Sequence, residues 1–478
     1  MPESGAGATG KPTSRSLGQP PRPAPPFFAP CIRPGFDTRV SGSVVASTAV
    51  ALHHGPMTDT QPDLHPDHVA DPALLGYALE RLSRSRAPAA SPLPPGNPAL
   101  ALSALPEHLP EAGLGAEAAL ELLAGPMLDG SAQLHHPGYF AHMDPPTAAV
   151  TWLAALWQAA ANQNLLHPDA GPTARALERR LVGWLAPYFG MDGGHLVPGS
   201  TVANFTALWA ARELRGVRRV LASERAHLSV RKSADILGLR YEAVPSDRRH
   251  RLQTTRLPVA GDGLGDAVVV ATAGTVATGA LDPLAIEGAA WLHVDAAWGG
   301  PLVFTERHAN LLEGVERADS VGFSAHKWCY QPKGTAAILF RDSAAAHGAM
   351  SYGGGYLSAP NIGLLGSAPA TALPFAASLL CWGRAGLAER IETGMAAAAT
   401  FARLVEDGSR FELWGPPETG VVVWRPRTVS AAALRERLRG AWVSVTDIDG
   451  EVWLRAVAAN PSADPRYVYE RAVAALAS

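Results

Sequence analysis

Lysine is rare in this chain, and one lysine stands in a context that favours amine chemistry. Only four of the 40 basic residues are lysines, at positions 11, 232, 327 and 333. An arginine keeps its proton near neutral pH and cannot form an imine, whereas a lysine can lose its proton and can form an imine. Lys327 lies in Ser-Ala-His-Lys-Trp (324–328), shortly after His-Val-Asp-Ala-Ala-Trp-Gly-Gly (293–300). These two segments supply a candidate nucleophile and a candidate carboxylate, Asp295.

Other polar residues follow predicted strands or begin a predicted helix. Asp295 and His227 each come after a predicted strand, and Ser200 and Thr201 follow Gly199 at the start of a predicted helix. Ligands of open parallel sheets bind at the carboxyl ends of the strands, and a helix N-terminus with glycine and hydroxyl groups binds phosphate. A phosphate site, a carboxylate, an imidazole and a rare amine together are the set that pyridoxal phosphate (PLP) requires.

Each of these residues also has a simpler explanation. Asp295 could be a turn former at the end of a strand, and His227 could begin a helix with its ring bonded to the backbone. The Ser200-Thr201 pair could cap a helix, which is compatible with phosphate binding. Lys333, in a Gln-Pro-Lys-Gly turn, is the alternative amine. We expect Lys327 to be the reactive one, because the turn around Lys333 is typical of a connection between elements.

The segments that carry these residues alternate between helix and strand, which predicts an α/β fold with a mainly parallel sheet flanked by helices. Beyond about residue 360 the pattern changes, and we expect a smaller α+β domain. The expected helices span 72–82, 116–123, 149–162, 174–187, 201–215, 228–237, 306–317, 370–405 and 430–439. The expected strands span 217–222, 239–244, 267–272, 291–294, 320–323, 411–414, 420–425 and 451–457.

Composition narrows the class of protein. The chain has 478 residues, 47% of them hydrophobic, which is enough for two or more domains. A net charge of −3 gives no reason to expect nucleic acid or an anionic membrane as partner, and no apolar run reaches the ~18 residues of a membrane span. The three cysteines, Cys31, Cys329 and Cys381, form no Cys-x-x-Cys pair, which favours a reducing, cytoplasmic setting.

The first 56 residues read as an extension rather than a domain. They are rich in proline, glycine and serine, so we expect them to be disordered. Arginines outnumber acids there, as in a targeting peptide, but the prolines would break the helix that such a peptide needs. Met57 is a candidate start, and deletion of 1–56 should leave folding and activity intact. We then expect a helical segment over 57–135, a large PLP-binding domain over 136–359 and a small domain over 360–478.

Six motifs, in order along the chain, resemble the group II PLP-dependent amino-acid decarboxylases, which include glutamate, aromatic amino acid and diaminobutyrate decarboxylases. The resemblance implies the PLP-dependent transferase fold (fold type I) and conversion of an L-amino acid to its amine and CO₂. It also implies a homodimer with shared active sites. The motifs are His-Pro-Gly-Tyr-Phe (136–140), Gly-Ser-Thr-Val-Ala-Asn (199–204), Ala-His-Leu-Ser-Val-Arg-Lys (226–232), Thr-Ala-Gly-Thr-Val-Ala-Thr-Gly-Ala-Leu-Asp-Pro (272–283), His-Val-Asp-Ala-Ala (293–297) and His-Lys-Trp (326–328).

The resemblance implies a role for each matching residue. Lys327 would be the Schiff-base lysine, and Asp295 would pair with the ring nitrogen of PLP. His227 would stack on one face of the ring, with Ala297 against the other. The remaining cofactor residues would hold the phosphate (Ser200, Thr201, Ser324 and His326) or line the ring (Thr272).

The resemblance also implies which residues meet the substrate: His136, Tyr139, Phe140 and His142, with the Asn162-Gln163-Asn164 stretch nearby. The histidines at 135, 136 and 142 lack the spacing or accompanying cysteines of a metal site, and we expect no metal. Arg455, in Trp-Leu-Arg-Ala-Val (453–457), could bind a carboxylate or could be an ordinary strand residue.

A glycine-rich segment, 351–358, resembles the mobile loop that brings a proton-donating tyrosine to the partner subunit's site. Tyr356 matches best and Tyr352 is the alternative; an ordinary exposed loop is the simpler explanation. The chain departs from the family in two places: Gly-Ser-Ala-Pro-Ala-Thr (366–371) lacks the usual arginine near Ala368, and the mobile loop itself is short. Another PLP reaction (carbon–carbon lysis, transamination or decarboxylation-dependent oxidation) and a catalytically silent PLP-binding scaffold therefore stay open as alternatives.

Overall fold

A computed structural model describes residues 68–87, 89–94, 102–258 and 263–477. The chain divides into two units, Met1–Val69 and Ala70–Ser478, and the description below concerns the second unit. The predicted extension 1–56, the candidate start Met57 and Cys31 lie outside the described residues.

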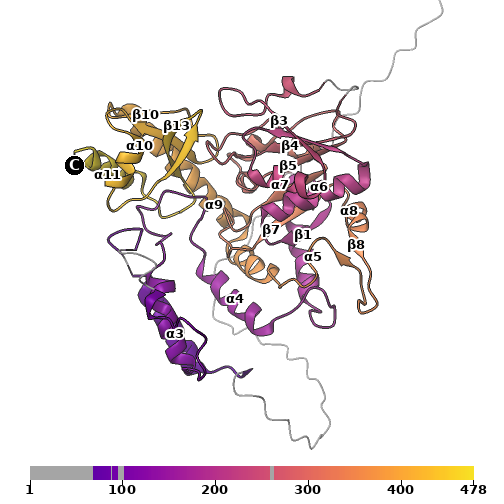
Figure 1. The fold of residues 1–478 in the computed structure, drawn as a ribbon, viewed down its shortest axis with the longest axis horizontal. Coiled ribbons are helices and arrows are strands. Elements are labelled where there is room, and N and C mark those ends of the chain that lie inside the picture. Colours follow the sequence, from indigo (N-terminus) through magenta and orange to yellow (C-terminus); the bar gives the residue numbers. More distant parts are fainter. Residues whose placement is uncertain (1–67, 88, 95–101, 259–262, 478) are drawn as a thin grey trace, which may run out of the picture. The chain divides into compact units, whose positions relative to one another are not determined.

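The second unit is built around a seven-stranded sheet in the order β1-β7-β6-β5-β4-β2-β3 (Figure 1). Among these strands β7 alone runs opposite to the others, so the sheet is mostly parallel, as the alternation of helices and strands predicts. The strands are β1 (Gly193–Val197), β2 (Arg219–Ser223), β3 (Arg240–Val244), β4 (Ala267–Thr272), β5 (Trp291–Asp295), β6 (Ser320–Phe323) and β7 (Ala336–Phe340).

Helices cover both faces of this sheet, and β5 shows how the sequence directs its side chains. Trp291, His293 and Asp295 alternate with Leu292 and Val294, so the first three point to one face of the sheet and the last two to the other. Trp291 packs in the core under α6 (Ser200–Arg215) and α7 (Leu228–Ile236). Leu292 and Val294 pack in the core on the opposite face, with residues of α5 (Ala174–Leu185) and α9.

The C-terminal part forms a four-stranded antiparallel sheet, β10-β11-β13-β12, with two helices (Figure 1). Its strands are β10 (Phe411–Leu413), β11 (Val421–Pro426), β12 (Ser444–Ile448) and β13 (Glu451–Val457), and its helices are α10 (Ala431–Arg437) and α11 (Pro465–Ala477). The long helix α9 (Ala372–Asp407) precedes it and is broken at Gly383, whose φ of 61° lies in the left-handed region that favours glycine.

Before the large sheet the chain forms α1 (Pro72–Ser85), α3 (Ala116–Ala124) and α4 (Ala149–Ala161). The segment from Tyr139 to Phe140 then joins the C-terminal sheet: Tyr139 bridges Trp442, and the Phe140 N–H donates to the Trp442 carbonyl at 3.0 Å. The first residues of the predicted large domain therefore pack with the small domain.

One predicted helix is wrong and several elements were not predicted. Residues 306–317 form two short 3₁₀ turns, Ala309–Leu312 and Val315–Arg317, because Gly314 between them adopts a φ of 94° that no α-helix accommodates. Strands β1, β7 and β12 and helix α11 lack a predicted counterpart. In the described part of the chain, no helix is long and apolar enough to cross a membrane.

Candidate active site

The start of α6 has the features of a phosphate seat. No side chain caps this helix at Gly199, so its first N–H groups are not occupied by a capping oxygen. Ser200 Oγ lies 2.7 Å from Ser324 Oγ, which comes from the end of β6, 124 positions later. The fold thus brings Ser200 and Ser324 together, while the Thr201 side chain beside them is exposed.

Asp295 ends β5 with its carboxylate buried and held from two sides. Its Oδ1 accepts the Ala297 N–H at 3.1 Å, and its Oδ2 accepts Asn204 Nδ2–H at 2.8 Å from α6. Asp295 is 2% exposed. A buried carboxylate needs such partners to stay ionised, so this one is held in a single orientation and can still accept a further donor.

His227 precedes α7 and is held through one ring nitrogen. Its Nδ1 lies 2.7 Å from Ser229 Oγ and accepts the Ser229 N–H at 3.2 Å. Burial lowers the pKa of His227; the Asp295 carboxylate opposes that shift and Lys327 adds to it. A neutral ring with Nδ1 as acceptor carries its proton on Nε2, which leaves Nε2–H for a bound group.

The two candidate lysines differ in their surroundings. Lys333 is 62% exposed and forms an ion pair with Asp144. Lys327 lies deeper, and burial lowers its pKa, although the nearby Asp295 carboxylate works in the opposite direction. A lowered pKa increases the fraction of neutral amine, which is the form that attacks a carbonyl carbon.

The tryptophans that follow Asp295 and Lys327 connect this region to the small domain. Trp298 and Trp328 pack with their ring centroids 4.1 Å apart. Trp298 Nε1–H donates to the Thr419 carbonyl at 2.6 Å, and Trp328 Nε1–H donates to the Ala458 carbonyl at 3.0 Å.

Two polar atoms near Lys327 and Asp295 are buried without a hydrogen-bond partner: Thr272 Oγ1 and His326 Nδ1. Thr272 is paired with Asp295 across β4 and β5. His326 is next to Lys327, and burial together with Lys333 and Lys327 lowers its pKa to about 4. Buried polar groups without partners are uncommon and require an explanation.

The residues expected to meet the substrate are only partly brought together. Phe140 is fully buried in the small-domain core against Phe401, and His136 is bonded through both ring nitrogens to the backbone at Ala89 and Gly138. Tyr139 is also buried, and desolvation followed by the charge of Asp144 raises its pKa to about 12.

His142 is exposed at its surface. Partial desolvation of the ring, followed by the Arg455 charge, lowers the His142 pKa, while the Asp144 charge raises it. Arg455 itself is 8% exposed. Its Nη1 donates to the Val276 carbonyl at 2.5 Å and its Nε to Ser444 Oγ at 3.1 Å. It also influences the pKa of Lys327.

The predicted mobile loop is the connection between two short strands, β8 (Ser351–Tyr352) and β9 (Asn361–Ile362). Tyr356 is 75% exposed, whereas Tyr352 stacks on Trp209 with ring centroids 6.0 Å apart. Asn164 holds the segment that lacks the family arginine: its Nδ2 donates to Ser367 Oγ at 3.1 Å.

Comparison with known proteins agrees with these features. Residues 98–427 match the pyridoxal-dependent decarboxylase conserved domain. L-2,4-diaminobutyrate decarboxylase of Rhizobium meliloti (strain 1021) is 32% identical over 408 residues, which covers 76% of this chain and 82% of the relative. The chain belongs to the pyridoxal-dependent decarboxylase family. It is a PLP-dependent carboxy-lyase that decarboxylates an amino acid.

Other members of the family extend the comparison. Aspartate 1-decarboxylase of Aliivibrio fischeri (strain ATCC 700601 / ES114) is 28% identical over 372 residues, covering 65% of this chain and 68% of the relative. The crystal structure of Oryza sativa TDC with PLP and tryptamine superimposes with a TM-score of 0.77 at 22% identity, covering 87% of this chain and 99% of that one. The fold is therefore that of the fold type I decarboxylases, as predicted.

The residues present fit PLP. The uncapped start of α6, the Ser200–Ser324 pair and the unpartnered His326 Nδ1 suit a phosphate group. The buried carboxylate of Asp295 suits a protonated ring nitrogen, and the half-buried amine of Lys327 suits imine formation.

Some residues around these groups were not given roles in the sequence prediction. Asn204 bonds to Asp295, Ser229 to His227, His293 to Asn204, and Asp144 to Lys333. Asn204 and His293 both lie inside motifs quoted above, but their contacts join a helix to a strand 89 positions away, which no local pattern reveals. Asp144 follows His142 by two positions and was not singled out.

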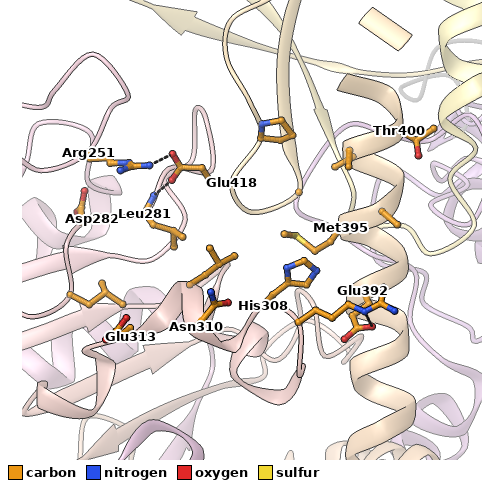
Figure 2. A pocket seen from close by; sticks show the side chains of 18 of the residues that line it. Arg251, Leu281, Asp282, His308, Asn310, Glu313, Glu392, Met395, Thr400 and Glu418 are labelled. Atoms are coloured by element: carbon orange, nitrogen blue, oxygen red, sulfur yellow. Dashed lines mark hydrogen bonds and ion pairs between the residues drawn. The ribbon is translucent and has the colours of Figure 1, made fainter. Parts of the chain in front are cut away.

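A separate cavity of about 880 Å³ lies where loops of the large domain meet α9 and the loop before β11; we call it the junction cavity (Figure 2). Glu418 bonds to Arg251 at 2.5 Å and to the Leu281 N–H at 3.1 Å. Glu392 pairs with Arg307 at 3.8 Å. None of the residues proposed to hold the cofactor lines this cavity.

Proposed function

We propose that this decarboxylase acts through Lys327, Asp295 and His227, with the cofactor phosphate at Ser200, Thr201, Ser324 and His326. One arrangement carries the assignment: Asn204 Nδ2 lies 2.8 Å from Asp295 Oδ2 and 2.9 Å from Ser229 Oγ, which lies 2.7 Å from His227 Nδ1, and the Asp295 charge also acts on Lys327. Thr272 and Ala297 complete the proposed cofactor contacts.

When bound, PLP accepts the electron pair that the amino acid releases on losing CO₂. The protein residues supply position and charge. Asp295 keeps the proton at the ring nitrogen, because a carboxylate with only two donors can accept a third. Lys327 would supply the amine that holds the cofactor. Its lowered pKa favours the neutral form of that amine.

We infer that Arg455 binds the carboxylate of the substrate. Its guanidinium is buried, stays charged even though burial lowers its pKa, and uses only Nη1 and Nε for the contacts described above. A bidentate contact with a carboxylate would use the remaining N–H groups. His142 stands beside it and is the best supported of the four expected substrate residues.

A cationic amino acid is the substrate class that we propose. Asp144 contributes to the electrostatics of Lys327, Arg455 and His142 alike. Its ion pair with Lys333 is at the surface, so a substrate ammonium group can compete for it. Two relatives named L-2,4-diaminobutyrate decarboxylase support this choice.

We propose that the enzyme works as a homodimer. Apolar side chains that a partner could cover are exposed on α1, α3 and α4, among them Leu79, Leu123, Leu153 and Trp157, the last at 66%. Tyr356 on the β8–β9 connection is also exposed, as expected of a loop that serves another subunit's site. The unpaired Cys329 and Cys381 support a cytoplasmic location.

The decisive experiment is a visible spectrum of the purified protein, followed by a panel of amino acids assayed for CO₂ and amine. We expect an imine absorption band, its loss in Lys327→Ala, and the highest rate with L-2,4-diaminobutyrate among acidic, basic and aromatic candidates. Formation of a keto acid or aldehyde would instead indicate another PLP reaction. Persistence of the band in Lys327→Ala would contradict the assignment of the amine, and Lys333→Ala is the matched control.

The loop tyrosine needs its own test. If Tyr356 donates the proton that replaces CO₂, Tyr356→Phe lowers amine formation by about 10²–10⁴-fold and leaves the imine band intact. Tyr352→Phe is the control, because Tyr352 is stacked on Trp209. Unchanged amine formation in Tyr356→Phe would remove this residue from the mechanism.

A further inference from the structure

A buried set of polar side chains lies between the large sheet and α6, behind the proposed cofactor site. It contains Asn204 of α6, His293 of β5 and Ser320 of β6, each with at most 1% of its surface exposed. The stated roles of Asp295 and His227 do not account for it. Polar groups buried this deeply persist only when their hydrogen bonds are satisfied, so the direction of every bond can be worked out.

The Asp295 carboxylate determines the orientation of the Asn204 amide. A carboxylate only accepts, so the nitrogen of the amide must face Asp295 Oδ2 at 2.8 Å. The second N–H of the same nitrogen donates to Ser229 Oγ at 2.9 Å. The Ser229 hydroxyl then donates to His227 Nδ1 at 2.7 Å. One amide nitrogen therefore joins the carboxylate to the imidazole through Ser229.

The amide oxygen, Asn204 Oδ1, also has a defined hydrogen-bond partner. Asn204 Oδ1 lies 3.0 Å from His293 Nε2, which must carry the proton. His293 is neutral at pH 7, since burial lowers its pKa to about 4 against the opposing charge of Asp295. Its Nδ1, which also lies 3.2 Å from the Ser320 carbonyl oxygen, thus accepts the Ser320 hydroxyl at 2.9 Å, and Ser320 Oγ accepts Trp291 Nε1–H at 2.8 Å.

Side-chain alternation along β5 and a glycine on β6 leave the space that this chain of hydrogen bonds occupies. Trp291, His293 and Asp295 alternate along β5 on the face toward α6. Gly322 on β6 stands opposite Asp295, and a Cβ there would lie 3.5 Å from His293 Cε1 and 3.7 Å from Asn204 Oδ1. Its Cβ would also meet Ala203 Cβ at 3.0 Å, so a larger residue would press α6 away from the sheet.

We propose that Asn204 is the positioning residue of the cofactor site, which holds the Asp295 carboxylate and the His227 ring in fixed relation to each other. The donors that run from Trp291 through Ser320 and His293 keep its amide from turning over. A turned amide would set Oδ1 against the Asp295 carboxylate. This inference rests on the proposed roles of Asp295 and His227.

The Asn204→Asp variant tests this positioning role without relying on enzyme activity. The new carboxyl group would stand against Asp295, and two adjacent carboxylates cannot both ionise easily. We expect the variant apoprotein to lose stability relative to the wild type as the pH rises above about 4, the ordinary range of these groups. We also expect its dissociation constant for PLP to rise about 10–100-fold at pH 7.5.

The pH dependence separates positioning from packing. Once protonated, the new carboxyl group can again donate to Asp295, so the affinity of Asn204→Asp for PLP should recover as the pH falls. Ser320→Ala, at the far end of the chain of bonds, should weaken PLP binding by a smaller factor, about threefold to tenfold. Thr206→Val is the matched control on α6, because its hydroxyl bonds only to the Val202 carbonyl of its own helix.

The outcomes separate this inference from the proposed function. If Asn204→Asp binds PLP as the wild type does at every pH, the positioning role is wrong, while loss of PLP affinity in Asp295→Ala would still support the assigned site. If Asp295→Ala also binds normally, the site assignment itself fails. An equal loss of affinity in Thr206→Val would overturn the positioning role in favour of general damage to α6.

Discussion

The proposed cofactor site and the junction cavity differ in the groups that they bring together. Around Lys327, Thr272 Oγ1 and His326 Nδ1 are buried without partners, and α6 begins without a cap. In the junction cavity, Glu418 is engaged by Arg251 and the Leu281 N–H, and Arg251 Nε is buried without a partner (Figure 2). The comparison teaches that empty volume alone does not identify the site of the chemistry, because none of the proposed cofactor residues lines this cavity.

Among the variants that test this difference between the two regions, we expect those of Arg455 to have the largest effect. If it binds the substrate carboxylate, Arg455→Gln should raise the KM of the preferred amino acid about 10–100-fold, because a charged hydrogen-bond partner is lost. Arg455→Lys should restore only part of the loss, since a lysine cannot make the bidentate contact. Steady-state kinetics measure both.

Arg307→Gln is the matched arginine variant in the junction cavity, where Arg307 is 80% exposed and pairs with Glu392. It should leave KM within about twofold. An equal rise of KM in both variants would show that the two regions do not differ in function.

Asp282 lies between the two regions and should give an intermediate effect. It lines the junction cavity, yet its Oδ2 accepts the Thr272 N–H at 2.8 Å behind the cofactor site. Burial raises its pKa to about 6 despite the hydrogen bonds from Leu252 and Thr272. A raised pKa means that the folded state binds the proton more tightly, so stability falls as the pH rises from about 4 to about 6.

The side chain in the Asp282→Asn variant cannot ionise, so the variant should lack this pH-dependent contribution to stability. Its free energy of unfolding, relative to the wild type, should therefore increase between pH 4 and pH 6 by an amount on the order of 2 kcal/mol. Urea unfolding at several pH values measures the difference. A constant difference across this range would show that Asp282 does not titrate there.

Glu418 should give the smallest effect. Glu418→Gln weakens the contacts to Arg251 and the Leu281 N–H, and should lower the free energy of unfolding by about 1 kcal/mol. PLP affinity should stay within about twofold, because none of the proposed cofactor residues lines the cavity. A large loss of PLP affinity in this variant would contradict the proposal that the junction cavity is separate from the cofactor site.

The sequence identifies candidate reactive groups more readily than the contacts that hold them. Lys327, Asp295 and His227 stand near strand ends in distinctive motifs, and local patterns identify such positions. The partner of Asp295 on α6 could not be predicted this way, because Asn204 and Asp295 are 91 positions apart and meet only when the helix packs on the sheet.

Local patterns also misjudged some elements. The apolar spacing over 306–317 resembles a helix, but the left-handed conformation of Gly314 interrupts it. Phe140 was expected at the substrate and is instead in the small-domain core, which reflects the pairing of its segment with Trp442. Neither outcome follows from residue types alone, since both depend on contacts between distant segments.

The packed pair Trp298 and Trp328 has a consequence for the order of folding. Their indole N–H groups donate to carbonyls 121 and 130 positions later in the chain, at Thr419 and Ala458. A growing polypeptide can form the β5 and β6 segments long before those acceptors leave the ribosome. The surroundings of Lys327 are therefore complete only after Thr419 and Ala458 have been synthesised.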